Sequence, residues 1–535
     1  MRSQRIRNAA IAAFLTSTLG ASAAHAAGFP PGTLILSRSQ YQGTASTVVV
    51  GQALPGAVSP DAGVPAPTAV ADGTLPNVWN NEVPDPSFGV TSPIFLDDLS
   101  PTGVTLGTVP VPPAQMVTSF SSKSELGLNL STDSKFVTFI GYVATVNTLD
   151  VSNSNTPNHN DPTNPVALSF QRAVGQVDLQ GNFQVTPVNT YSGNNGRAAI
   201  YDATNNQYIL VGNAGNGGSP EPVGIVNNTG VQLAPIGSAA LPETTVVGVQ
   251  QGVAGAANGF QFGYSVVQNG FAADKSGKDD NFRGLAIFGN TLYVTKGSGS
   301  NGVNTVYQVG TAGTLPTTTD ASTTAISILP GFPATLARSA GAIFPFAIWF
   351  ANATTLYMAD EGDGKVADAA TDVNAGLQKW VLQSGTWTNV YTLQNGLNLG
   401  TQYSVSGLPS SLNPATDGLR TLSGNVNTDG TVTLYAVTST VSASGDQGAD
   451  SNRLVTITDN LSFMTAAAAS GESFTTLQTA PFGQVFRGVQ RVPGTFTPPP
   501  VPAIPRGGTA CLGLALLALG AAAIRVKKHG FPTIA

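Results

Sequence analysis

The chain has 535 residues, of which 10% are charged, and its 61 glycines lack the three-residue period of collagen. Seven of its 23 basic residues lie in two terminal segments without acidic residues, so 29 acidic residues face 16 basic ones between them. This acidic region repels nucleic acid and anionic lipid heads, which excludes these partners, but it permits cations such as Ca²⁺. Many turn-forming residues and no long amphipathic helical pattern predict an all-β, secreted protein.

Residues 1–26 have the three parts of a signal peptide. Three arginines form the positive region, Ala9–Leu19 is mostly apolar, and residues 24–26 form a small-x-small cleavage site. We therefore expect a signal helix, export through the Sec pathway, and a mature chain that begins near Ala27. A buried N-terminal helix is the alternative.

A strand–turn–strand unit recurs five times within residues 27–495, and its turn is rich in Gly, Asn, Asp or Thr. Two further strand-like runs follow each copy, which gives four strands per unit, the pattern of β-propeller blades. In the second copy these runs are expected at Pro222–Asn227 and Val231–Ile236. The five copies are Leu126–Tyr142, Gly196–Gly212, Arg283–Thr295, Pro345–Asp360 and Leu419–Thr438.

The sixth unit is split between the two ends of the region. Val485–Val492 supplies a first strand, Thr33–Arg38 a second, and Ile94–Leu99 and Val104–Val109 the third and fourth. The predicted fold is a six-bladed β-propeller of four-stranded antiparallel blades, whose ring is closed by strands from both termini. Such closure removes exposed sheet edges, so we expect a monomer. The uneven spacing of the copies leaves a seventh blade open.

The C-terminus contains a second targeting segment. Residues 496–508 form a Pro/Gly-rich stalk, and residues 509–535 form a short apolar helix with a basic tail. The apolar run Ala510–Ile524 is shorter than the roughly 20 residues of a permanent transmembrane helix. The segment resembles exosortase and rhombosortase sorting signals, chiefly through Gly507-Gly508, although it lacks the Pro-Glu-Pro triplet. The resemblance implies a sorting protease and membrane contact through this segment; a simple membrane anchor is the alternative.

The segments LILSR, SGNNGR, NFRGLAIFGNTLYV, LPGFP, LYMAD, LQKWVLQSGTW and VFRGV occur in this order within Thr33–Pro493. Together they resemble secreted bacterial β-propeller proteins that are loosely related to the YVTN/NHL type and often carry C-terminal sorting tails. The resemblance implies a fold and a location at the surface of a Gram-negative bacterium, outer membrane-associated or extracellular. It implies no reaction.

Arginine occupies equivalent places at the start of the first strand in four blades. That strand is innermost in a propeller, so the guanidinium groups are candidates for binding a carboxylate or phosphate. The alternative is that each arginine ties neighbouring blades together. The candidate ligand-binding residues are Arg197, Arg283, Arg420 and Arg487, with Trp79 as the aromatic most expected to be exposed.

Acidic loops precede or follow blade strands on what we expect to be one face of the ring. Converging carboxylates are the ligands that Ca²⁺ requires, although no run has EF-hand spacing. Solvated acids in turns are the alternative. The candidate metal ligands are Asp279, Asp280, Asp360, Glu361 and Asp363.

Histidine catalysis and the usual zinc sites are nearly excluded, because only His159 lies outside the terminal segments and the one cysteine, Cys511, lies in the tail. No catalytic residue is assigned. The leading hypothesis is a non-catalytic surface protein that binds a carbohydrate, a protein or matrix through one loop face. The competing hypothesis is a Ca²⁺-assisted hydrolase of the lactonase- or phytase-like propeller kind. A glycosidase carboxylate pair and a quinone-dependent dehydrogenase are weaker alternatives.

Overall fold

The computed structural model divides the chain into two compact units, Met1–Thr495 and Phe496–Ala535, and the account below concerns the first unit. Residues 28–497 are described except for gaps, and residues 250–267 are described only as backbone strands. The predicted signal peptide, C-terminal helix and Trp79 lie outside the described residues. Within the described part, no helix is long and apolar enough to span a membrane. The gaps are residues 55–65, 72, 75–77, 79–87, 121–125, 163, 216–224, 226, 238–242, 249, 253–260, 265, 268–278, 298–301 and 442–449.

Six sheets, each containing four antiparallel strands, form the blades of a β-propeller, as predicted. We number the blades along the ring and give their strands from the inside outward. Blade 1 is β29 (Gln484–Arg491), β1 (Leu34–Gln40), β3 (Ile94–Leu99) and β4 (Thr105–Pro110); blade 2 is β6 (Asn129–Leu130), β7 (Phe136–Tyr142), β8 (Arg172–Asp178) and β9 (Phe183–Val188); blade 3 is β10 (Gly196–Asp202), β11 (Gln207–Gly212), β12 (Gly230–Pro235) and β13 (Thr245–Val247).

Blades 4 to 6 come from the second half of the chain. In blade 4, a short strand β16 (Val266–Val267) adds to the outer edge in parallel, which the sequence did not predict. Blade 4 is β17 (Leu285–Phe288), β18 (Thr291–Lys296), β19 (Thr305–Val309) and β20 (Ile326–Ile328); blade 5 is β21 (Pro345–Asn352), β22 (Thr355–Asp360), β23 (Gly376–Gln383) and β24 (Thr386–Leu393); blade 6 is β25 (Ala415–Val426), β26 (Thr431–Val441), β27 (Arg453–Asn460) and β28 (Thr475–Thr479).

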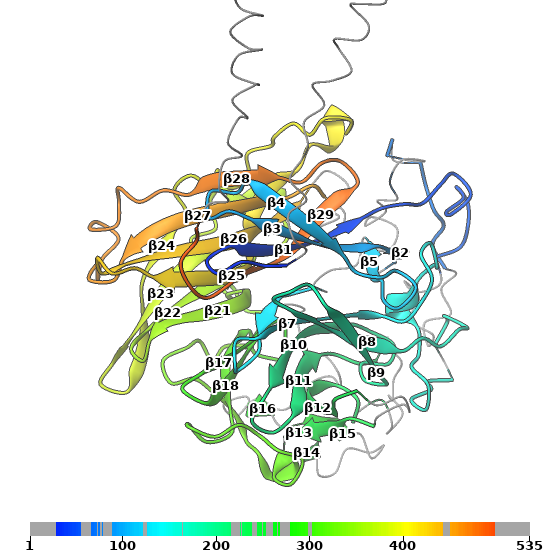
Figure 1. Cartoon of the computed structure of the whole chain (residues 1–535), viewed down its shortest axis with the longest axis horizontal. Coiled ribbons are helices and arrows are strands. Elements are labelled where there is room, and N and C mark those ends of the chain that lie inside the picture. Colours follow the sequence, from blue (N-terminus) through cyan, green and yellow to red (C-terminus); the bar gives the residue numbers. More distant parts are fainter. Residues whose placement is uncertain are drawn as a thin grey trace, which may run out of the picture. The chain divides into compact units, whose positions relative to one another are not determined.

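The ring closes within blade 1, where strands from the two ends of the propeller pair with each other. β29 lies antiparallel to β1, from Leu34 opposite Arg491 to Gln40 opposite Gln484, and both strands lie together in Figure 1. We call the boundary between blade 6 and blade 1 the seam. Ser423 of blade 6 accepts a hydrogen bond from the Arg491 N–H at 2.9 Å across it. The predicted closure by both termini is therefore present.

The order of the outer strands in blade 3 was predicted incorrectly. β12 is the third strand of this blade, whereas the sequence placed the run at Val231–Ile236 fourth. The fourth strand is β13, which pairs with β12 from Val231 opposite Val247 to Leu233 opposite Thr245. β13 is too short to show a recognisable alternating pattern. The apolar run Val231–Ile236 was therefore predicted as the fourth strand.

Short strands and helices also lie outside the six blades. Two small antiparallel sheets pair β2 (Val90–Ser92) with β5 (Thr118–Phe120), and β14 (Gln250–Gly252) with β15 (Gln261–Tyr264). The helices among the described residues are one turn or so long. They are η3 (Val151–Asn153), η4 (Ala321–Thr323), α3 (Val366–Ala369) and η5 (Ser410–Leu412).

The hydrophobic core lies between blades, where apolar faces of neighbouring sheets meet. One cluster joins Val211 of blade 3 to Val294 of blade 4, and another joins Leu377 of blade 5 to Leu434 of blade 6. At the innermost strands the backbones approach so closely that glycine is required. A Cβ at Gly284 would lie 2.3 Å from the Phe346 carbonyl oxygen in the next blade. This close approach fixes the innermost strand of each blade against its neighbour.

Candidate functional site

The four arginines at the start of the first strands lie on or next to the innermost strand of their blades. Arg197 is in β10, Arg420 in β25 and Arg487 in β29, and Arg283 directly precedes β17. Only 4–6% of each residue is exposed. The repeat pattern therefore located four buried guanidinium groups.

Two of these arginines share one carboxylate across blade 5. Arg283 Nη2 lies 3.6 Å from Glu361 Oε1, and Arg420 Nε lies 3.1 Å from Glu361 Oε2. Glu361 follows the second strand of blade 5, so its side chain links blades 4, 5 and 6. The sequence had assigned Glu361 to a metal site, and the structure brings it to the arginines.

Phe346 completes this central cluster, and the sequence offered only a weak signal for it. The guanidinium carbons of Arg283 and Arg420 lie 6.0 and 5.7 Å from the centroid of its ring. Gly284 lies close to the carbonyl of Phe346 in the next blade, and Gly488 lies close to the carbonyl of Leu126 in the same way. By this equivalence, Phe346 occupies the innermost position of blade 5. The sequence pattern marked this position by an arginine. Blade 5 has Phe346 there instead, and its ring lies near the guanidinium groups of Arg283 and Arg420.

The other two arginines also contact neighbouring elements. Arg197 Nη2 donates to Asn213 Oδ1 at 3.0 Å in its own blade and to Asn281 Oδ1 at 3.3 Å in the approach to blade 4. Arg487 Nε donates to Ser39 Oγ at 3.3 Å, and its Nη2 donates to the Ser119 carbonyl at 3.4 Å. These contacts match the alternative in which arginines join neighbouring elements. Ligand binding by the four arginines stays a prediction.

The predicted metal ligands are engaged by hydrogen-bond donors of the protein. Asp360 Oδ2 accepts the Phe344 N–H at 2.9 Å, and Oδ1 accepts the Gly362 N–H at 3.0 Å. Burial, opposed by these N–H groups, raises the pKa of Asp360 well above its ordinary value. Asp363 forms an ion pair with Lys365.

Asp279 and Asp280 precede β17 and are buried. Thr229 Oγ1 donates to Asp280 Oδ1 at 3.1 Å, which fixes this carboxylate against blade 3. Across the described residues, no three His, Cys, Asp or Glu side chains are grouped as metal ligands. Metal binding by the five predicted acidic residues stays a prediction.

Asp417 is an unpredicted acidic residue beside Asp360 and Glu361, and it titrates near neutrality. It lies in β25, and its Oδ2 accepts the Gly364 N–H at 2.9 Å. Burial, reinforced by Asp363, Glu361 and Asp372, raises the pKa of Asp417 from 3.8 to about 7. The neutral form is thus favoured in the folded protein, so this residue favours folding at low pH.

We expect the Asp417→Asn variant to remove part of the pH dependence of stability. Because the folded pKa exceeds the unfolded one, the contribution is complete below pH 3.8 and is lost as pH rises through about 7. Three pKa units correspond to about 4 kcal/mol, an upper limit for the difference. Urea unfolding at pH 5, 6, 7 and 8 checks this: the variant should be more stable than wild type at pH 8, and parallel pH profiles would contradict it.

The tryptophans of the outer strands pack between blades. Trp380 in β23 and Trp387 in β24 are 5% and 6% exposed and share a core cluster with residues of blade 4. Trp380 also stacks on Phe332 at 3.9 Å between ring centroids. These two side chains are therefore part of the core.

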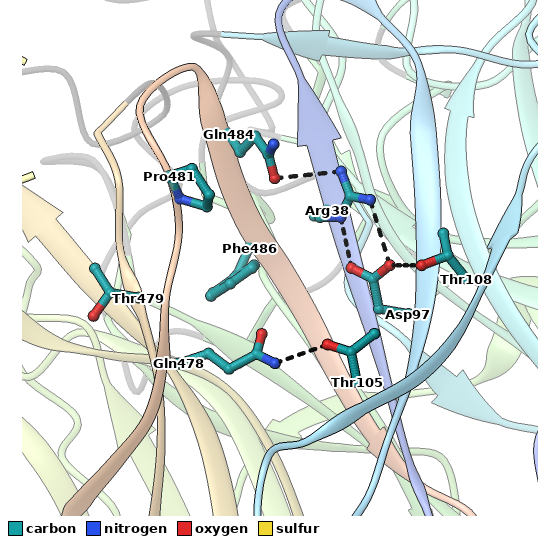
Figure 2. A pocket seen from close by; sticks show the side chains of 9 residues that line it. All are labelled: Arg38, Asp97, Thr105, Thr108, Gln478, Thr479, Pro481, Gln484 and Phe486. Carbon is teal, nitrogen blue, oxygen red and sulfur yellow. Dashed lines mark hydrogen bonds and ion pairs between the residues drawn. The ribbon is translucent and has the colours of Figure 1, made fainter. Parts of the chain in front are cut away.

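A cleft of about 340 Å³ opens at the seam, and we call it the seam cleft (Figure 2). Its floor includes Phe486 of β29, between a wall from the end of blade 6 and a wall from the outer strands of blade 1. All of its lining residues lie in parts of the chain that the ring closure brings together. They are Arg38, Asp97, Thr105, Thr108, Gln478, Thr479, Pro481, Gln484 and Phe486.

Hydrogen bonds hold the polar groups of the seam cleft in place. Arg38 Nε and Nη2 donate to the two oxygens of Asp97 at 2.6 and 3.4 Å, and Nη1 donates to Gln484 Oε1 at 3.3 Å. Thr108 Oγ1 donates to Asp97 Oδ1 at 2.6 Å. Arg38 also lies over the Phe95 ring, 4.3 Å from its centroid. The guanidinium group is therefore preorganised, and its charge is balanced by the adjacent carboxylate.

The opposite wall is anchored across the seam. Gln478 Nε2 donates to the Gly103 carbonyl at 2.7 Å and to Thr105 Oγ1 at 3.1 Å. Figure 2 shows this bond on the side of the cleft away from Gln484. Sequence reasoning missed the whole site, because its residues come from β1, β3, β4, β28 and β29 and have no common spacing.

Comparisons with known proteins find only distant likenesses. No protein-family model and no curated protein sequence matches the chain. A solved protein from Lactobacillus plantarum is 10% identical, with a TM-score of 0.34 over 76% of this chain and 98% of the other. The haemagglutinin-neuraminidase ectodomain of parainfluenza virus 5 is 12% identical, with a TM-score of 0.32 over 92% and 95%. Likenesses at this level carry no argument about function.

Proposed function

We propose that this chain is an exported β-propeller that binds a polar ligand, carbohydrate or protein, at the cell surface and leaves it chemically unchanged. The signal-peptide pattern of residues 1–26 and the sorting-signal resemblance of residues 496–535 support the location. The single observation that carries the binding role is the seam cleft. Its 340 Å³ volume falls in the range of small-molecule sites, about 300–1,000 Å³, and its polar groups are held in fixed positions.

The position of the cleft suits a binding protein. A ligand there contacts blade 6 through Gln478 and Thr479 and blade 1 through Arg38 and Gln484. It therefore bridges blade 6 and blade 1, the blade within which the ring closes. A ligand that binds only the folded state adds stability by mass action, so binding and ring closure support each other.

A substitution that fills the cleft tests this proposal. Thr479 is exposed on β28, and within the described residues its side chain makes no hydrogen bond, so Thr479→Trp fills the space without removing native bonds. The matched control is Thr388→Ala, an exposed threonine on the outermost strand of blade 5.

Affinity electrophoresis through gels with neutral polysaccharides, and biolayer interferometry on a peptide library, provide the readouts for the purified full chain. Wild type and Thr388→Ala should bind a ligand of at least one class, Thr479→Trp should not, and the ligand should be recovered with its mass unchanged. Equal binding by Thr479→Trp, no binding by wild type, or cleavage of the ligand would each overturn the proposal.

A further inference from the structure

The charges and hydrogen-bonding groups that line the seam cleft indicate the class of its ligand. Its two charged residues, Arg38 and Asp97, are paired with each other at 2.6 Å, so the lining has no net charge. The region between the terminal segments is acidic, with 29 acidic against 16 basic residues. Both facts disfavour an anionic ligand, because the cleft offers it no unbalanced cation and the surrounding field repels it.

The polar atoms left for a ligand include both donors and acceptors. Arg38 has five N–H donors, and four of them are used by Asp97, Gln40 and Gln484 within the described chain. The Gln484 amide nitrogen and the Gln478 amide oxygen make no hydrogen bond to described residues. The cleft thus presents one guanidinium N–H, an amide donor and an amide acceptor.

Threonine hydroxyls add groups that both donate and accept. Thr479, Thr105 and Thr108 are exposed on the outermost strands at the two sides of the cleft. A ligand hydroxyl likewise donates one hydrogen bond and accepts two. A ligand with several adjacent hydroxyls therefore matches this mixture, whereas a carboxylate or an ammonium group matches only part of it.

The cleft also offers a small apolar surface. Pro481 lines it and is exposed, whereas Phe486 is only 3% exposed and belongs to the core. A small apolar surface with polar side chains around it suits a ring that has an apolar C–H face and hydroxyls at its edge. The volume of about 340 Å³ lies near the lower limit for small-molecule sites, which suits a short ligand better than an extended peptide.

The geometry points to a neutral pyranose unit as the ligand of the seam cleft, with its C–H face toward Pro481 and its hydroxyls bonded to Gln478 Oε1, Gln484 Nε2 and Arg38. This inference rests on the proposed binding function and names its ligand class. It assigns the apolar contact to Pro481, the acceptor to Gln478 and the donor to Gln484. A terminal sugar of a polysaccharide meets these requirements as well as a free glycoside does.

Calorimetric titration of the purified full chain tests the assignment. The probes are the methyl glycosides of glucose, galactose and mannose, and the methyl glycoside of glucuronic acid as the anionic counterpart of glucose. The variants are Gln478→Ala and Thr479→Trp. The matched control is Gln383→Ala, which removes an exposed glutamine from the end of β23 in blade 5.

At least one neutral glycoside should bind wild type and Gln383→Ala equally. Gln478→Ala should weaken binding about tenfold, as expected for the loss of a hydrogen bond, and Thr479→Trp should abolish it. If Gln478→Ala weakens the seam, Thr479→Trp still tests the assignment, because Thr479→Trp keeps every native hydrogen bond. The glucuronide should bind more weakly than the glucoside.

Three outcomes would overturn the assignment: no neutral glycoside binds, the glucuronide binds more tightly than the glucoside, or Thr479→Trp binds a glycoside as wild type does. The fate of the proposed function is read separately. If glycosides fail but a peptide binds wild type and not Thr479→Trp, the sugar assignment falls and the binding function stands. If Thr479→Trp affects no ligand, both fall.

Discussion

Replacing Lys379 with methionine is expected to lower the free energy of unfolding by about 3–5 kcal/mol, the cost of removing one partner of a buried ion pair. Lys379 Nζ lies 2.9 Å from Asp459 Oδ2, and both side chains are fully buried. Lys379 lies in blade 5 and Asp459 in blade 6, so the pair joins two blades. The variant leaves the Asp459 carboxylate buried without its cation.

Two tyrosines and three backbone carbonyls, those of Asn460, Leu461 and Phe463, surround this pair and make the loss harder to compensate. The Tyr391 hydroxyl donates to Asp459 Oδ1 at 2.5 Å, and the Tyr357 hydroxyl donates to Oδ2. Lys379 Nζ also donates to the carbonyls of Asn460 at 2.8 Å and Phe463 at 3.0 Å. Burial raises the pKa of Tyr357 and Tyr391 above the ordinary value, so both remain donors at neutral pH.

Urea unfolding of the full chain at pH 7 measures this effect. The matched control is Lys365→Met, because Lys365 forms an ion pair with Asp363 but its side chain is 66% exposed. This control should cost less than about 1 kcal/mol, as exposed ion pairs do. The double variant Lys379→Met/Asp459→Asn should recover part of the loss, because it also removes the buried negative charge. Equal losses in Lys379→Met and Lys365→Met would show that the pair does not hold blades 5 and 6 together.

Glu361→Gln should destabilise the centre of the ring by about 3 kcal/mol or more, because it removes the charge that two buried arginines share. Arg283 and Arg420 are 6% and 4% exposed, and both approach the Glu361 carboxylate. Glutamine keeps the shape of the side chain, so the change isolates the charge. Glu243→Gln is the control, since the Glu243 side chain is 62% exposed and contacts His159 at 3.3 Å and the Asn158 amide at 3.4 Å. Unfolding of both variants in urea gives the comparison, and a Glu361→Gln loss as small as that of Glu243→Gln would contradict the prediction.

Adding inorganic phosphate to Glu361→Gln separates the two interpretations of the central arginines. If the arginines only join neighbouring elements, phosphate should shift the unfolding midpoint of this variant no more than it shifts that of wild type. Restoration of the lost stability by millimolar phosphate would instead show that anions reach Arg283 and Arg420. That result would return the anion-binding prediction to the centre of the ring.

The sequence predicted the blades well where local signals determine them. β23 and β24 are the two strand-like runs predicted after the copy Pro345–Asp360, and Ser384 and Gly385 join them in a two-residue hairpin turn with positive φ angles of 50° and 81°. Closure through β29 and β1 was also predicted, because a first strand without a successor and a second strand without a predecessor complete one blade. β13 was missed because it is three residues long, and its place is set by pairing with β12.

The candidate sites were less predictable, since they depend on which blades become neighbours. The repeat located Arg283 and Arg420, but Glu361 was assigned to metal binding, since nothing in the sequence places its side chain between them. The seam cleft joins Arg38 to Phe486 across almost the whole propeller sequence. No local spacing relates such residues, and the cleft exists only because the ring closes.

A crystal structure of the full chain with a methyl glycoside tests the central claim, that the seam cleft is the ligand site, most directly. The predicted result is a sugar ring in the seam cleft, within hydrogen-bond distance of Gln478 Oε1 and Gln484 Nε2. A sugar bound elsewhere with the cleft empty, or no bound sugar at a concentration that saturates the chain in solution, would contradict the claim.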